Sequence, residues 1–98
     1  MKVVIVEPGK PGYVKDIEDK LENLQQIVGG YIEAITLKPG VVLVCNEEGK
    51  IKGLPINRDI GFDYICGTFF ICGTKGEDFA SLNDIQVETY LNAFSGTQ

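Results

Sequence analysis

The chain has 98 residues, of which 44% are hydrophobic and 23% are charged, and its formal net charge is −5. These values are typical of one soluble globular domain, here residues 1–98, with a modest core. The acidic balance argues against nucleic-acid binding through phosphates, which needs clustered lysine and arginine, and no apolar run approaches the roughly 18 residues of a membrane span.

The first half of the chain predicts a strand, a helix and a hairpin. Residues 2–6 form a β-branched apolar run that begins directly after the start, without a signal-peptide layout, so we expect a buried strand and an intracellular location. A helix is predicted over about 15–28, where one apolar stripe recurs at Ile17, Leu21, Leu24 and Val28. Residues 31–37 and 41–46 predict two strands joined by a tight turn.

The second half begins with a turn over 47–50, where we expect positive φ at Gly49, and a short return strand is predicted to begin at Ile51-Lys52. Residues 53–61 have no usable periodicity and exceed the typical connection length of about four to six residues, which favours a functional loop. Residues 64–73 predict a strand in which Gly67 marks a bulge or a close approach by another group.

A polar loop over 74–79 is then expected, followed by a second helix that Ser81 caps and that runs to about Phe94. This order of elements predicts an α+β fold, a small and mainly antiparallel sheet of four to five strands with two helices packed on it.

The three cysteines, Cys45, Cys66 and Cys72, lie in or beside apolar runs and are expected to be buried free thiols. With no histidine and no Cys-x-x-Cys spacing, a zinc site is not expected, and neither is any other metal or cofactor.

The sequence contains few candidate catalytic residues. The absence of histidine excludes a Ser-His-Asp or Cys-His arrangement. The carboxylates nearest the irregular segment are Glu47, Glu48, Asp59 and Asp63. Solvated turns, or a pair between Asp59 and the neighbouring arginine, explain them better than catalysis. We therefore expect a protein that is not an enzyme, although a metal-dependent hydrolase using carboxylates alone stays open.

The single arginine, Arg58, is the strongest candidate for recognition. It follows Asn57 in the irregular segment, where Gly53, Leu54 and Pro55 shape the chain. A guanidinium presents a planar fork that suits phosphate or carboxylate. Two interpretations stay open for Arg58, an anionic ligand or an exposed ion pair with Asp59 or a glutamate.

Further ligand contacts are expected from Gly67 and Thr68, where a ligand can approach the backbone. An aromatic side chain near Arg58 would then stack on a base, although for each of them taken alone a place in the core is favoured. The candidates are Tyr31, Phe62, Tyr64, Phe69 and Phe70.

Three groups of residues resemble, in order and spacing, the family known as domain of unknown function 3846. They are Val28-Gly29-Gly30-Tyr31-Ile32-Glu33, then Asn46-Glu47-Glu48-Gly49-Lys50 with Gly53-Leu54-Pro55 and Asn57-Arg58, then Gly67-Thr68-Phe69-Phe70-Ile71. The similarity spans nearly the whole chain, although the helix and the C-terminal segment match only in character.

The resemblance implies a setting in phages, prophages or Gram-positive bacteria, and hence a cytoplasmic location in a bacterial host. It carries no established enzymatic role. Small phage proteins often counter host defence, which leaves two hypotheses. We expect a homo-oligomeric sponge that sequesters a nucleotide-derived immune signal through Asn57 and Arg58. The alternative is an acidic, antirestriction-like protein that mimics DNA or blocks a host protein. Replacing Arg58 by alanine should abolish capture and shift the thermal midpoint by only a few degrees.

Overall fold

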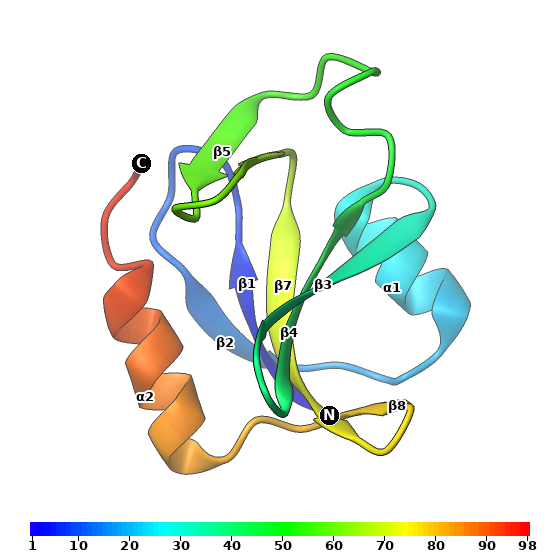
Figure 1. Cartoon of the computed structure of the whole chain (residues 1–98), viewed down its shortest axis with the longest axis vertical. Helices are drawn as coiled ribbons and strands as arrows, with labels where there is room; N and C mark the ends of the chain where they lie inside the picture. Colours follow the sequence, from blue (N-terminus) through cyan, green and yellow to red (C-terminus); the bar gives the residue numbers. More distant parts are fainter.

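A six-stranded antiparallel sheet forms the centre of the structure, a computed structural model that describes residues 1–98 (Figure 1). Five strands are hydrogen-bonded in the order β2-β1-β7-β4-β3, and β8 pairs with β7. Their bounds are β1 (Lys2–Val6), β2 (Tyr13–Asp16), β3 (Ile32–Lys38), β4 (Val41–Asn46), β7 (Phe69–Lys75) and β8 (Asp78–Ala80).

A separate two-stranded hairpin, β5 (Ile56–Asp59) and β6 (Tyr64–Cys66), lies over the end of the sheet where β4 finishes and β7 begins (Figure 1). The helices are α1 (Leu21–Val28) and α2 (Asp84–Ala93). Neither is long and apolar enough to span a bilayer. The α+β class with a mainly antiparallel sheet is confirmed, although the sheet has more strands than the sequence predicted.

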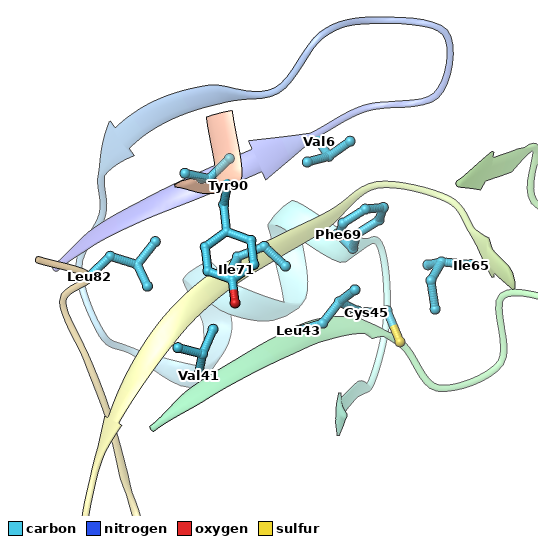
Figure 2. Packing of buried hydrophobic residues seen from close by; sticks show 10 residues of the cluster. Val6, Val41, Leu43, Cys45, Ile65, Phe69, Ile71, Leu82 and Tyr90 are labelled. Carbon is cyan, nitrogen blue, oxygen red and sulfur yellow. The ribbon is translucent and has the colours of Figure 1, made fainter. Parts of the chain in front are cut away.

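The two faces of the sheet bury two different hydrophobic clusters, because successive side chains of a strand point to opposite faces. On β1, Val4 and Val6 belong to one cluster, whereas Val3 and Ile5 belong to the other. The first cluster is completed by Tyr90 of α2 (Figure 2), and the second by residues of α1. Because both faces are covered, the central strands β1, β4 and β7 are almost wholly apolar.

The N-terminal helix is shorter than predicted, and residues 13–16 form strand β2 instead of its first turn. β2 pairs with β1 along the sheet edge, and the terminal ammonium of Met1 donates a hydrogen bond to Asp16 Oδ1 at 2.9 Å. The apolar Ile17 is indeed buried, but it reaches the core from the connection and not from a helix. Strand pairing therefore overrides the helical spacing of the apolar residues.

The second half also differs from its predicted elements in several places. The segment 53–61 contains β5, the expected return strand at Ile51-Lys52 is part of a turn, and 74–79 forms the β7–β8 hairpin. The predicted strand 64–73 is divided into β6 and β7 at Gly67. The helix α2 begins at a capping box made by Asn83 and Gln86, not at Ser81.

Gly49 is not among the glycines with positive φ, in contrast to the expectation from the turn. A Cβ at this position would lie 2.6 Å from the carbonyl oxygen of Cys66. Glycine is therefore needed there because the turn after β4 passes directly against the backbone of β6.

Candidate functional site

Asn57 and Arg58 are adjacent in β5, and yet both side chains are buried. The pairing register of β5 with β6 shifts between Ile56 and Arg58, which is the mark of a β-bulge. In a regular strand one of two neighbouring side chains would face solvent. The bulge turns both inward, so this pair lies in an ordered strand and not in the irregular loop that the sequence predicted.

Asn57 joins three segments that are far apart in the sequence. Its Nδ2 donates to the carbonyl oxygens of Val6 and Gly67, each at 2.9 Å. Its Oδ1 accepts a hydrogen bond from Arg58 Nη1 at 2.7 Å. Asn57 therefore fixes the β5–β6 hairpin against the end of β1 and the junction of β6 with β7.

Arg58 is only 3% exposed, and its guanidinium contacts oxygens of its own chain. Nη2 donates to the carbonyl of Lys10 in the β1–β2 connection and to the carbonyl of Gly96 beyond α2, both at 2.6 Å. None of the ion pairs in the structure includes Arg58, so one of the two interpretations left open, an exposed pair with Asp59 or a glutamate, is wrong. The Nε nitrogen is buried without a hydrogen-bond partner, and burial lowers the pKa of the group.

Some of the other residues predicted for this site lie beside Asn57, and others do not. Leu54, Pro55 and Gly67 come together beside Asn57, since the Gly67 amide donates to the Pro55 carbonyl at 2.7 Å. Gly67 has a φ of 85°, and a Cβ there would lie 2.8 Å from Leu54 Cδ1. The close approach predicted at Gly67 is thus made by Leu54. Thr68 beside it is half-buried, whereas Gly53 lies in an exposed turn.

The aromatic candidates do not gather around Arg58. Phe69 is fully buried and packs edge-on against Phe94, with ring centroids 5.4 Å apart. Phe70 is buried on the opposite face of the sheet. Tyr31 is exposed and lies beside Lys52, in a small depression at the end of α1. Phe69 and Phe70 are therefore core residues, and Tyr31 is separate from the arginine.

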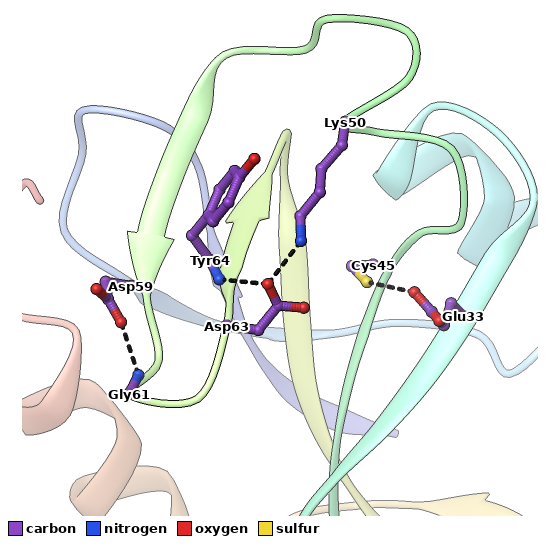
Figure 3. Close-up of polar contacts among 7 residues, drawn as sticks. All are labelled: Glu33, Cys45, Lys50, Asp59, Gly61, Asp63 and Tyr64. Atoms are coloured by element: carbon purple, nitrogen blue, oxygen red, sulfur yellow. Dashed lines mark hydrogen bonds and ion pairs between the residues drawn. The ribbon is translucent and has the colours of Figure 1, made fainter.

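An open cleft of about 520 Å³ lies next to the Asn57–Arg58 pair. We call it the arginine cleft after the adjacent Arg58, whose own side chain is not part of the lining. It is lined by the immediate neighbours of the arginine and of its carbonyl partners, namely Gly9, Ile56, Asn57, Asp59, Thr97 and Gln98. Asp59 contributes the one charged side chain of the lining, and its Oδ1 accepts from the Gly61 amide at 2.7 Å (Figure 3).

A second and more enclosed hollow, of about 280 Å³, lies between β3, the turn after β4 and the β5–β6 hairpin. We call it the acidic hollow, because its lining includes three carboxylates, Glu33, Glu47 and Asp63, and one ammonium, Lys50. Lys50 Nζ contacts Asp63 Oδ1 at 2.6 Å and lies 4.2 Å from the centroid of the Tyr64 ring (Figure 3). This contact raises the pKa of Lys50 and lowers that of Asp63.

The thiol of Cys45 opens on the acidic hollow and faces Glu33 at 3.8 Å (Figure 3). Burial, together with this carboxylate, raises the pKa of Cys45 to about 11. Burial likewise raises the pKa of Cys72 to about 12. All three cysteines are buried, as predicted, and these two stay protonated and poorly nucleophilic at neutral pH.

Two features of these sites have no signal in the sequence. The carbonyl partners of Arg58 come from Lys10 and Gly96, and a backbone carbonyl leaves no trace in residue type. The acidic hollow joins Glu33 of β3 with Lys50 and Asp63, which only the packing of the hairpin brings together. Lys50 lies 13 residues before Asp63, so no local sequence pattern indicated their contact.

Comparison with known proteins identifies one family. The family described as Domain of unknown function (DUF3846) matches residues 1–95. No curated protein and no solved structure matches the chain.

Proposed function

The chain belongs to the DUF3846 family, and we propose that it captures a small nucleotide-derived anion at the arginine cleft and holds it without chemical change. In a phage or bacterial cell such a protein acts as a sponge for an immune signalling molecule. The observation that carries the proposal is the buried guanidinium of Arg58, which has no carboxylate partner.

A buried cation without an anion is unusual, because removal of a charge from water is costly unless it is paired. Here neutral carbonyl and amide oxygens supply the contacts of Arg58, and Nε has none. A phosphate would supply the missing negative charge, and guanidinium groups bind phosphate oxygens in a forked geometry. These two features support a phosphate as the ligand.

On the proposal, the ligand reaches the Arg58 guanidinium by displacing the C-terminal segment. The carbonyl of Gly96 is one of the two partners of Nη2, and no hydrogen bond holds Thr97 or Gln98. On the proposal, a phosphate oxygen replaces this carbonyl while Asn57 and the Lys10 carbonyl keep the guanidinium in place. Asp59 lines the same cleft, so its negative charge opposes the ligand and limits affinity.

The arginine cleft is open, and an open cleft buries less of a ligand than the enclosed pockets typical of small-molecule sites. The proposal therefore includes a homo-oligomer in which a second copy covers the cleft. Light scattering after gel filtration, with and without ligand, measures the mass of the assembly.

The function is tested by the thermal midpoint of the protein with cyclic di-AMP, cyclic ADP-ribose and ADP-ribose, with adenosine as the phosphate-free control. At a hundredfold excess over Kd, a ligand that binds only the folded chain adds about 2.7 kcal/mol, which raises the midpoint of a domain of this size by roughly 10 to 20 °C. A saturable rise with a phosphate compound, and none with adenosine, is the expected result.

The matched variant is Asp59→Asn, which keeps an oxygen for the Gly61 amide and removes the opposing charge. It should bind the same anion about three- to tenfold more tightly, an effect that weakens with salt. If no phosphate compound raises the midpoint of the wild type or of Asp59→Asn, the sponge hypothesis fails. Equal shifts with adenosine would assign binding to the base and not to Arg58.

A further inference from the structure

The acidic hollow carries more negative charge than the chain neutralises. Of its three carboxylates, only Asp63 has a cation, the ammonium of Lys50. Glu33 accepts only the weak thiol contact from Cys45, and Glu47 takes part in no ion pair. The hollow also has an apolar wall that includes Ile35 and Ile65. Such a lining complements a cation on an apolar stem.

Lys50 shows how such a cation is held. Its ammonium lies between a carboxylate at 2.6 Å and the ring of Tyr64 at 4.2 Å, the two groups that proteins use most often for ammonium recognition. The side chain of Lys50 is 45% exposed and comes from a turn, so it can leave without breaking the core. Lys50 thus occupies the place of an external ammonium group.

The exposed residues of the lining favour a protein over a free amine as the ligand of the hollow. Ile51 and Tyr64 of the lining are 85% and 44% exposed. An exposed tyrosine beside an exposed aliphatic side chain is typical of protein interfaces, where a few anchors supply most of the affinity. A free polyamine would leave these side chains uncovered.

We infer that the acidic hollow is a docking site for a lysine side chain of a basic partner protein, which displaces Lys50 from Asp63 and Tyr64 and places further positive charge beside Glu33 and Glu47. The site is separate from the arginine cleft, and it does not depend on the sponge function.

The test uses two synthetic peptides, acetyl-Gly-Leu-Lys-Leu-Gly-amide and the same peptide with norleucine in place of lysine. Each is titrated into the ¹⁵N-labelled chain, and backbone amide shifts are followed at Glu33, Lys50 and Tyr64. The lysine peptide should produce saturable shifts there and bind about threefold more tightly, because the contacts with Asp63 and Tyr64 that it gains are those that Lys50 gives up, and only the exposed carboxylates Glu33 and Glu47 add to the balance.

Two variants separate this site from general charge attraction. Lys50→Met vacates the ammonium position and should tighten binding of the lysine peptide about tenfold. Lys52→Met, whose ammonium pairs with Glu48 at 3.8 Å, should leave it unchanged. Equal binding of the two peptides, or an equal effect of both variants, overturns the inference. Spermidine that matches the lysine peptide at equal ionic strength also overturns it, because the occupant is then a free polyamine.

Discussion

Replacement of Arg58 by alanine tests whether this side chain holds the fold together. Three of its hydrogen bonds are 2.6 to 2.7 Å long and end on Asn57, Lys10 and Gly96. A hydrogen bond to a charged group contributes about 1.5–3 kcal/mol, so three at the lower limit give about 4.5 kcal/mol. The alanine variant also removes the buried Nε, which has no hydrogen-bond partner, and this recovers about 1–2 kcal/mol. The free energy of unfolding should therefore fall by about 3 kcal/mol.

Urea denaturation followed by circular dichroism measures this loss, and the thermal midpoint should fall by roughly 12 to 24 °C. The sequence predicted a shift of only a few degrees because it treated Arg58 as a loop residue. The control is Lys52→Ala, an exposed lysine whose removal should change the free energy of unfolding by less than about 0.5 kcal/mol. If Arg58→Ala behaves like the control, the hydrogen bonds of Arg58 do not support the fold.

Three further outcomes are expected. Gly49→Ala places a Cβ 2.6 Å from the Cys66 carbonyl and should destabilise the chain by about 1–3 kcal/mol in the same urea assay, whereas Gly96→Ala, with open space around its Cβ, should be neutral. A chromogenic disulfide reagent at pH 8 should react with the three thiols only after unfolding; fast reaction in the native state would contradict their burial. The lowered pKa of Asp63 means that its contact with Lys50 stabilises the fold above the ordinary aspartate pKa and is lost as the pH falls below about 4. Stability measured from pH 5 to 2 should therefore fall less steeply in Asp63→Asn than in the wild type.

The central strands were predictable because both of their faces are buried. Residues 2–6 and 41–46 are continuous apolar runs, and they form β1 and β4 with the expected bounds. The edge strand β3 was predicted to within one residue at each end, whereas β2 and β5 were missed, since they contain polar residues whose partners are distant backbone groups. Neither apolar periodicity nor turn residues reveal such pairing.

The candidate site shows the same limit. The sequence identified Asn57, Arg58 and Gly67 as unusual, and the structure brings them together through a bulge. It could not reveal that Leu54 fills the space beside Gly67, or that carbonyls from residues 10 and 96 surround the guanidinium. These contacts depend on long-range packing. Phe69 was proposed for stacking, but its position on a central strand makes it core.

The most direct test of the sponge is to recover what the protein holds. The chain is incubated with the panel of signalling nucleotides, washed, heat-denatured, and the released molecules are identified by mass spectrometry. Sequestration at the arginine cleft predicts release of one intact phosphate-bearing compound in a fixed ratio to protein, and more of it from Asp59→Asn. Release of a cleaved product, or of no nucleotide from either protein, would contradict the account.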